Sequence, residues 1–330
     1  MKKKNYFITG GTGSFAGMFI EDLLKKKLAK KIIVFSRDEY KQLILKNQKY
    51  IKKNLKIFRF YLGDVRDAQR LEWAMHDDID VVVHAAALKQ VPATEYNPFE
   101  TVKTNIIGTQ NLVESCIKKN IDKTILISTD KAVSPINLYG ATKLTAEKLI
   151  ISANVFKGRR SCKFSVIRYG NVMGSRGSVI PILIDQNKNK NLAFTITDKR
   201  MTRFNITLGE ASNFVLNCVN KMKGGEVFIP KLPSYDIITL AKSININKKI
   251  KFIGIRPGEK LHEELITSAD YNNCIEHKNS YEILPLKINI RNKKKSKEVL
   301  KSYNSLENKN YLSIPKLKKL IKKELKNFDI

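Results

Sequence analysis

The stretch FITGGTGSFAG, residues 7–17, places a glycine-rich turn between the end of an apolar run and the start of a helical pattern. Gly10 and Gly13 permit a tight turn and let backbone N–H groups approach a pyrophosphate. Ala16 stands where a third glycine is usual, and alanine is tolerated there because the helix must pack closely on the strand. The stretch therefore predicts the phosphate-binding turn of a dinucleotide-binding unit.

Around this turn, short β-branched runs alternate with amphipathic stretches of helical period, such as residues 99–119 and a helix that begins near Asn137. This alternation predicts an α/β fold with a doubly wound parallel sheet (Rossmann), in which ligands bind at the carboxyl ends of the strands. The six expected strands are residues 5–9, 31–35, 56–62, 80–84, 124–128 and 163–168.

The regular alternation weakens after about Asn171, where loops interrupt shorter elements. Residues 1–170 are expected to form the dinucleotide-binding Rossmann domain, with the catalytic residues. Residues 171–330 are expected to form mainly a smaller C-terminal substrate-binding lobe. Some of its segments, such as EVFIP at residues 226–230, are expected to return to the Rossmann sheet.

The basic composition does not by itself indicate a nucleic-acid partner. The chain has 61 lysines and arginines against 31 acidic residues, a formal net charge of +30. Lysine is dispersed along the whole sequence, the aromatic residues are not interleaved with basic ones, and no groove-reading motif is present. We expect no nucleic-acid binding, although part of the charge can help to hold a nucleotide diphosphate.

No apolar run reaches the roughly 18 to 20 residues needed to span a bilayer, and the N-terminal residues lead into a strand without a signal-peptide pattern. A cytoplasmic protein with no stable membrane insertion is expected. The cysteines are far apart and form no ligand spacing, so neither a disulfide framework nor a metal site is expected. They are Cys116, Cys162, Cys218 and Cys274.

The end of the second expected strand bears on the choice of cofactor. Ser36 and Arg37 come first there and can bind a 2′-phosphate, which favours NADP over NAD. Asp38 follows, either as a helix cap or as a ribose ligand. The residues expected to bind the cofactor are Gly10, Thr12, Gly13, Ser14, Phe15, Ser36, Arg37, Asp38, Lys41, Asp64, Val65, Ala85, Ala86, Ala87, Tyr139 and Lys143.

Tyr139 and Lys143 are four residues apart, which puts a phenol and an ammonium on one face of a helix. A phenol titrates near pH 10, so its anion must be stabilised before it can accept a proton from a sugar hydroxyl near neutral pH. Lys143 and a positively charged nicotinamide can do this, and Thr129 would hold the same hydroxyl by hydrogen bonding. The three residues predict oxidation of a sugar alcohol.

Asp130 and Lys131 form a second acid–base pair directly after Thr129. Oxidation of carbon 4 of a hexose makes the proton on carbon 5 acidic, so a base there and an acid at the 6-hydroxyl can eliminate water. The hydride then returns to carbon 6 and the cofactor is regenerated. The pair therefore predicts a 4,6-dehydration, catalysed by a lyase on a dehydrogenase scaffold.

Several segments together resemble the inverting UDP-N-acetylglucosamine 4,6-dehydratases, which are extended short-chain dehydrogenase/reductases of bacterial pseudaminic acid biosynthesis. The resemblance covers roughly residues 4–270. The segments are GGTGSFAG, SRDEYKQ, GDVRD, HAAALKQVPATEYNP, STDKAVSPINLYGATK, RYGNVMGSRGSVIP, MTRF and GIRPGEKLHEELI.

The resemblance implies UDP-N-acetylglucosamine as substrate and UDP-2-acetamido-2,6-dideoxy-β-L-arabino-hex-4-ulose as product, the first step towards pseudaminic acid. It implies Lys131 as the base at carbon 5, Asp130 as the acid for the 6-hydroxyl and Tyr139 as the base for the 4-hydroxyl. The related dehydratases that retain configuration carry Asp-Glu where this chain has Asp130 and Lys131. The resemblance also implies a homo-oligomer, either a dimer or a hexamer.

A sugar nucleotide needs cations for its diphosphate, and the forked donors of Arg203 and Arg256 suit phosphate oxygens. Glu259 is expected to bind ribose hydroxyls or to orient Arg256. The residues expected to bind substrate are Lys89, Asn105, Thr129, Asn171, Ser175, Val179, Thr197, Arg203, Arg256 and Glu259.

Three alternative functions stay open. The same scaffold suits a retaining 4,6-dehydratase or a UDP-sugar epimerase, and a non-catalytic nucleotide-binding regulator would keep the fold without turnover.

Lys131 must lose its proton to act as a base, by desolvation or through nearby cations such as Lys143 and the oxidised nicotinamide. Its alternative role is that of a salt-bridged helper of Asp130.

Overall fold

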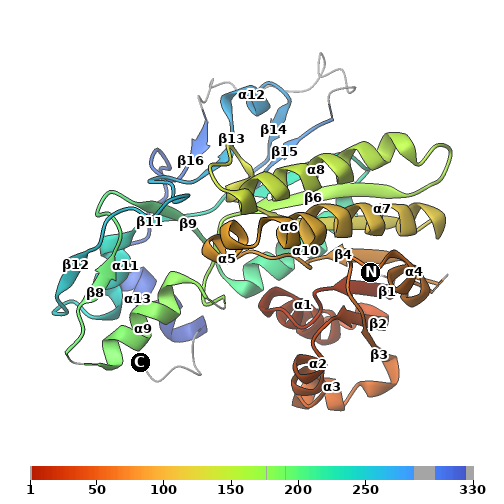
Figure 1. The fold of residues 1–330 in the computed structure, drawn as a ribbon, viewed down its shortest axis with the longest axis horizontal. Helices are drawn as coiled ribbons and strands as arrows, with labels where there is room; N and C mark the ends of the chain where they lie inside the picture. The colour runs from red at the N-terminus through yellow and green to blue at the C-terminus, as the bar shows by residue number, and fades with distance from the viewer. Residues whose placement is uncertain (1, 77, 176, 190, 286–301, 325–330) are drawn as a thin grey trace.

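The computed structural model describes residues 2–285, apart from 77, 176 and 190, and residues 302–324. A nine-stranded sheet of order β14-β15-β10-β6-β5-β4-β1-β2-β3 forms its centre (Figure 1). All pairs from β3 to β10 are parallel, and β15 and β14 add antiparallel strands at the edge. The strands are β1 Lys4–Thr9, β2 Ala29–Ser36, β3 Phe58–Leu62, β4 Val81–His84, β5 Lys123–Thr129, β6 Lys163–Tyr169, β10 Val227–Pro230, β14 Cys274–Glu276 and β15 Ser280–Ile283.

The order 3-2-1-4-5-6 within this sheet is that of a doubly wound fold, so the predicted fold class is confirmed. All six expected strands are present. The third begins at Phe58 rather than at residue 56, because Leu55–Ile57 form a 3₁₀ turn, η1. Strand order reverses between β1 and β4, which is the position where such folds bind ligands.

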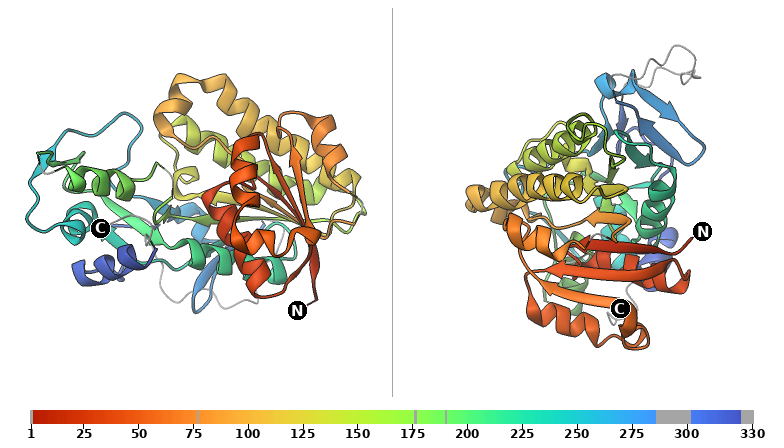
Figure 2. Two further views of the ribbon diagram at one scale, coloured as in Figure 1. Left: turned by 90° about the horizontal axis from the view of Figure 1, so that it is seen from below. Right: turned by 90° about the vertical axis from the view of Figure 1, so that its right-hand side faces the viewer.

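Helices cover both faces of the sheet (Figure 2). Helix α1 packs on α10 on one face, and α7 packs between α4 and α8 on the other. The expected helix over residues 99–119 is divided, because the π turn η2, Lys103–Ile107, separates α6 from α7. The helices are α1 Ser14–Lys25, α2 Glu39–Lys46, α3 Lys49–Lys52, α4 Ala68–Ala74, α5 Val91–Tyr96, α6 Pro98–Val102, α7 Gly108–Lys118, α8 Leu138–Phe156 and α10 Leu208–Lys221.

Val81, Val82 and Val83 show why the central strands lie inside the molecule. All three are fully buried, although alternate side chains point to opposite faces of the sheet. Strands with helices on both faces read as continuous apolar runs, because neither face meets water. The runs of β-branched residues therefore belong to the middle of a covered parallel sheet.

A smaller lobe follows β6 and lies at the opposite end of the molecule from β3 (Figure 1). It contains three small sheets, of order β11-β9-β7, β12-β8 and β13-β16. Its elements are β7 Asn171–Val172, α9 Val179–Lys188, β8 Phe194–Ile196, β9 Thr202–Ile206, β11 Ser234–Asp236, α11 Ile237–Ile244, β12 Ile250–Phe252, β13 Glu264–Ile266, α12 Ser268–Tyr271, β16 Tyr303–Asn304 and α13 Ile314–Glu324.

The described residues form two hydrophobic clusters. The larger one packs on both faces of the Rossmann sheet and includes Phe204 and Leu265 from the strands that follow residue 171. The smaller one joins α9, α11 and α13 around Phe194, Leu240 and Leu317. The chain after residue 171 thus contributes to both clusters, and β10 pairs in parallel with β6.

All four cysteines are buried and carry free thiols in the structure. None of the helices within the described ranges combines the length and the apolarity that crossing a membrane requires.

Candidate active site

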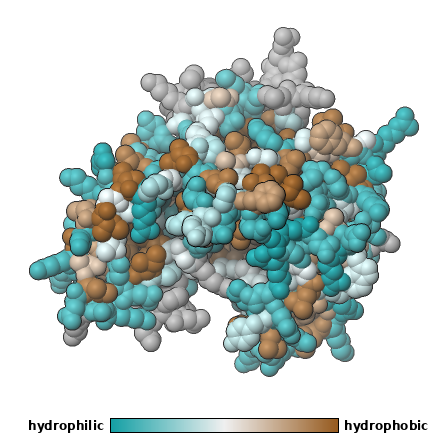
Figure 3. Space-filling view, viewed as in Figure 1, coloured by the Kyte–Doolittle hydropathy of each residue, from teal (hydrophilic) through white to brown (hydrophobic). Residues whose placement is uncertain are grey.

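A cleft of about 770 Å³ lies at the carboxyl ends of the parallel strands, and residues of both lobes line it. In the space-filling view, the surface is notched between the side that carries β8 and α9 and the side that carries α1 and α2 (Figure 3). The structure brings every predicted catalytic and cofactor residue into this one cleft, and nearly all of the predicted substrate residues.

The glycine loop is shaped to admit a phosphate group. Gly10 has a φ of +62°, and a Cβ at this position would lie 2.8 Å from the backbone nitrogen of Ala86. Gly13 is the N-cap of α1 and offers no side-chain cap, so the first N–H groups of the helix stay available. The donor set therefore fits the pyrophosphate of a dinucleotide.

The residues after β2 are arranged around a helix cap. Asp38 accepts a hydrogen bond from the backbone N–H of Lys41 at 2.9 Å and pairs with its ammonium at 2.6 Å. Of the two expected roles, the structure shows the cap. Arg37 is more than half exposed and lies 3.5 Å from a carboxylate oxygen of Asp64, whereas the Ser36 hydroxyl accepts a hydrogen bond from Gln42.

Tyr139 and Lys143 lie in the first turns of α8, whose N-cap Asn137 accepts a hydrogen bond from the backbone N–H of Gly140. Burial raises the pKa of Tyr139 to about 12, although the charge of Lys131 and a hydrogen bond with Thr129 act in the opposite direction. Burial also lowers the pKa of Lys143 to about 8, and its ammonium donates to the carbonyl of Ile127 at 2.7 Å.

Asp130 and Lys131 form the 3₁₀ turn η3, Asp130–Ala132, directly after β5. The Asp130 carboxyl is almost fully buried, and its Oδ1 accepts hydrogen bonds from Thr129 at 2.8 Å and from Lys131 at 3.1 Å. Burial raises the pKa of Asp130, and repulsion by Glu263 adds to the rise while Lys131 opposes it. The environment therefore makes this carboxyl easier to protonate than an exposed aspartate.

The charge state of Lys131 differs from the expectation that desolvation or nearby cations would remove the proton of its side chain. Its ammonium lies 3.1 Å from Asp130 Oδ1, 3.2 Å from Glu263 Oε1 and 3.4 Å from the amide oxygen of Asn171. Burial by itself lowers the pKa of Lys131, but the two carboxylates outweigh burial and the repulsion by Arg203, so the pKa is raised. The unliganded site therefore holds Lys131 as a cation.

The guanidinium of Arg203 donates to the backbone carbonyls of Thr202 and Leu261, at 2.7 and 3.0 Å. Glu259 accepts a hydrogen bond from the backbone N–H of Arg256 at 3.3 Å, so it contacts Arg256 through the main chain. These residues line the cleft together with Lys89, Asn171, Ser175, Val179 and Thr197.

Comparison with known proteins assigns the chain to a family. The family model described as "Polysaccharide biosynthesis protein" matches residues 6–285. This chain belongs to that family. The resemblance expected from the motifs is confirmed, because the chain is 49% identical to the UDP-N-acetylglucosamine 4,6-dehydratase (inverting) of Campylobacter jejuni over 86% of this chain and 83% of the relative.

Two further relatives of this polysaccharide biosynthesis family are informative. The UDP-glucose 4-epimerase of Rickettsia canadensis is 41% identical over 81% of this chain and 79% of its own length. The X-ray structure of Pen from Bacillus thuringiensis superposes with a TM-score of 0.87 at 39% identity and covers 97% of this chain and 98% of its own. The family scaffold therefore extends over almost the whole chain.

The structure does not place Asn105 in the cleft, although this residue was expected to bind substrate. Its side chain is buried in the π turn, and its amide group bonds both the N–H and the C=O of Leu88, at 2.8 and 2.9 Å. It also donates to the hydroxyl of Thr142 and does not line the cleft. Asn105 thus fixes the loop after β4 instead of facing the ligand, because its donors and acceptor are already used.

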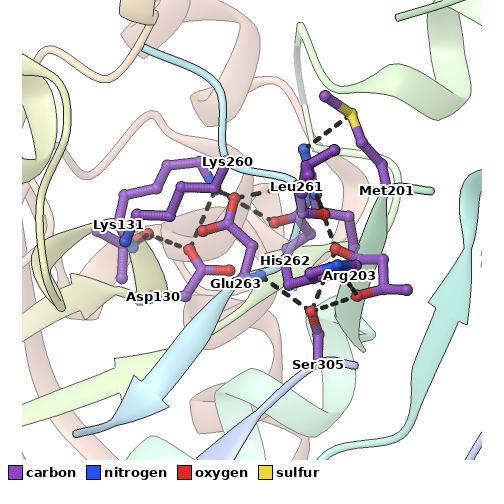
Figure 4. A network of polar contacts seen from close by, with 12 residues as sticks. Asp130, Lys131, Met201, Arg203, Lys260, Leu261, His262, Glu263 and Ser305 are labelled. Carbon is purple, nitrogen blue, oxygen red and sulfur yellow. Dashed lines mark hydrogen bonds and ion pairs between the residues drawn. The ribbon is translucent and has the colours of Figure 1, made fainter. Parts of the chain in front are cut away.

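Sequence reasoning missed two charged residues of the cleft, Lys260 and Glu263 (Figure 4). Both belong to the segment GEKLHEELI, in which only Glu259 was selected. Nothing in the spacing of this segment shows which glutamate turns inward. The one signal in the sequence is that Glu263 stands two residues before the apolar pair Leu265 and Ile266. In the structure this pair belongs to the short strand β13 and is buried.

Proposed function

We propose that this protein is an inverting UDP-N-acetylglucosamine 4,6-dehydratase, which forms UDP-2-acetamido-2,6-dideoxy-β-L-arabino-hex-4-ulose as the first step towards pseudaminic acid. The observation that carries the proposal is the presence of two proton-handling pairs in one cleft. Tyr139 with Lys143 serves oxidation at carbon 4, and Asp130 with Lys131 serves elimination across carbons 5 and 6. A simple epimerase or dehydrogenase needs only the first pair.

The glycine loop and the ends of β2, β3 and β4 would hold a nicotinamide cofactor, which accepts a hydride from carbon 4 and returns it to carbon 6. We favour NADP, because Arg37 and Lys41 follow β2 and line the cleft, and their cations suit a 2′-phosphate. Calorimetric titration with NADP and NAD tests this choice. Tighter binding of NAD would contradict it.

At carbon 4, Tyr139 takes the proton of the hydroxyl, and Thr129 holds that hydroxyl in place. The raised pKa of Tyr139 keeps the phenol protonated in the unliganded cleft. Its deprotonation therefore requires an additional positive charge nearby, which ties the oxidation to a loaded cofactor site.

At carbons 5 and 6, Asp130 donates its proton to the departing 6-hydroxyl and Lys131 serves the proton of carbon 5. The raised pKa of Asp130 suits an acid. The cationic state of unliganded Lys131 means that it must lose a proton before it takes one from carbon 5. The division of labour follows the resemblance. The 3.1 Å contact between Asp130 Oδ1 and Nζ of Lys131 couples the protonation of the two residues.

The decisive experiment is incubation with UDP-N-acetylglucosamine in deuterated water, followed by NMR of the product. We expect a 6-deoxy-4-ketose with deuterium at carbon 5, inverted configuration there and no net gain of reduced cofactor. Unchanged sugar from folded protein would refute the proposal.

Lys131→Ala should abolish dehydration while the protein stays folded, with Lys148→Ala on the exposed side of α8 as control. Full activity of Lys131→Ala would show that Lys131 is not the base.

A second candidate function is a UDP-sugar 4-epimerase, because the Rickettsia relative of this chain carries that name. The same NMR experiment separates the two functions. An epimerase product keeps the 6-hydroxyl and its carbon 5 hydrogen, whereas the dehydratase product has lost both the hydroxyl and the original hydrogen.

The homo-oligomeric state and the cytoplasmic location stay predictions. Analytical ultracentrifugation distinguishes a dimer from a hexamer, and fractionation of cells locates the protein.

A further inference from the structure

Glu263 carries a buried negative charge that the roles assigned above do not use. Its side chain is only 2% exposed, and it lines the cleft. Its Oε1 lies 3.2 Å from the ammonium of Lys131 and 3.7 Å from Nε of Arg203. Its Oε2 is buried and has no hydrogen-bond partner among the residues that the structure describes. A buried carboxylate of this kind is costly unless cations compensate it.

Asp130 holds the other side of the same ammonium. Its Oδ1 lies 3.1 Å from Nζ of Lys131. Its Oδ2, like Oε2 of Glu263, is buried without a hydrogen-bond partner in the described part of the chain. One ammonium therefore lies between two buried carboxyl groups, as Figure 4 shows. Two carboxyl groups that share a site do not ionise equally, because each disfavours the charge of the other.

The surroundings divide the charge unequally between the two carboxyl groups. Glu263 faces Arg203 as well as Lys131, and Arg203 is fixed by two backbone carbonyls. Burial would raise the pKa of Glu263, but Lys131 and Arg203 outweigh burial and lower it. The charged and titratable groups around the pair are Lys131 from η3, Tyr139 from α8, Arg203 from β9, Tyr235 from β11 and Lys260 from the segment before β13.

We propose that Glu263 is a positioning residue of the elimination site, which anchors the ammonium of Lys131 and carries the negative charge of the carboxyl pair, so that Asp130 keeps the proton. This inference rests on the proposed function. In the elimination, the O–H bond of Asp130 breaks and its proton goes to the 6-hydroxyl. The C6–O bond breaks to release water, the electron pair of the C5–H bond forms the C5–C6 double bond, and the proton of carbon 5 goes to Nζ of Lys131, which has first released one proton of its ammonium to solvent.

The first test uses the protein without substrate. Glu263→Gln removes the charge at equal size, Glu263→Asp keeps it, and Glu264→Gln changes the neighbouring glutamate, which bonds Ser134 and does not line the cleft. Carbon-13 NMR of labelled aspartate carboxyls, with Asp130 assigned by Asp130→Asn, gives its titration in each variant.

We expect Asp130 to titrate about one pH unit lower in Glu263→Gln than in the wild type, because the repulsion that keeps it protonated is gone. Glu263→Asp and Glu264→Gln should titrate like the wild type. Unchanged titration in Glu263→Gln would overturn the inference. Circular dichroism checks folding, and if Glu263→Gln does not fold, a shifted titration in the charge-conserving Glu263→Asp overturns the inference while a wild-type titration supports it.

The second test measures turnover. In Glu263→Gln, the loss of kcat for dehydration as the pH rises should begin at a lower pH than in the wild type, because Asp130 loses its proton earlier. Reduced cofactor should then accumulate, because oxidation at carbon 4 continues. Glu263→Asp should restore the wild-type pH profile. Equal loss of oxidation and elimination, or an unchanged profile, would contradict the inference. If the wild-type protein has no dehydratase activity, only the proposed function is refuted. The titration without substrate still tests the role of Glu263.

Discussion

His84 at the end of β4 is fully buried between two hydroxyl groups. Its Nδ1 lies 2.6 Å from the hydroxyl of Thr9, and its Nε2 lies 3.0 Å from that of Thr109. Burial, with a contribution from Lys143, lowers its pKa to about 3. The ring is therefore neutral in the folded protein, whereas in the unfolded chain it takes up a proton below about pH 6.5.

This difference predicts a loss of stability in acid. Between pH 6.5 and 3 the unfolded chain binds more protons at His84, so the free energy of unfolding falls as the pH falls. From pH 6.5 to 5 the loss is roughly 2 kcal/mol. Urea unfolding at the two pH values measures it. In His84→Gln, which cannot titrate, this part of the pH dependence should disappear, and an equal slope in both proteins would contradict the assignment.

Gly10 in the phosphate loop and Gly17 in the helix that follows it should respond oppositely to replacement by alanine. In Gly10→Ala the new Cβ meets the backbone of Ala86 at a positive φ, so dinucleotide binding and thermal stability should both fall. Gly17 lies within α1 with open space where a Cβ would point, so Gly17→Ala should stabilise the protein by about 0.5–1 kcal/mol. Thermal unfolding and titration with NADP give both values. Normal binding by Gly10→Ala would show that no close approach is needed there.

At the scale of elements, Arg168 joins β6, the catalytic helix α8 and the segment around β13. Its guanidinium is almost fully buried and donates to the Glu147 carboxylate at 3.2 and 2.7 Å, and to the carbonyl of Leu265 at 2.9 Å. Glu147 follows Lys143 by one helical turn and also accepts a hydrogen bond from Ser128. This ion pair therefore fixes the strand that leads to Asp130 and the helix that carries Tyr139.

Arg168→Met should lower the free energy of unfolding by about 3–5 kcal/mol, because it leaves Glu147 buried without its cation. Lys118→Met is the matched control, since it breaks an exposed pair with Glu72 and should cost less than about 1 kcal/mol. Urea unfolding compares the two variants. Equal losses would mean that burial of the pair does not matter.

At the scale of the whole molecule, residues of both lobes line the cleft, so the sugar nucleotide of the proposed function would contact both lobes. Binding to the folded state alone raises stability with ligand concentration, by about 2.7 kcal/mol at a hundred times the Kd. The basic residues of the lobe, Arg256 among them, are then expected to link ligand binding to the stability of the entire chain.

UDP alone should therefore raise the unfolding temperature, and Arg256→Ala should reduce this rise and weaken UDP binding about tenfold. Arg200→Ala, which breaks an exposed pair with Asp198 outside the cleft lining, should bind UDP as the wild type does. Calorimetry and thermal unfolding provide the measurements. Wild-type UDP affinity in Arg256→Ala would remove Arg256 from the phosphate site.

The sequence by itself determined the Rossmann core, the glycine loop and the Tyr139/Lys143 and Asp130/Lys131 pairs. These features depend on residues a few positions apart, whose spacing fixes a turn, a strand or one face of a helix. Only the tertiary structure decided that Glu263 faces Lys131 and that Asn105 turns away from the cleft. Charge states and partners of buried groups depend on segments far apart in the chain, which meet only when both hydrophobic clusters have formed.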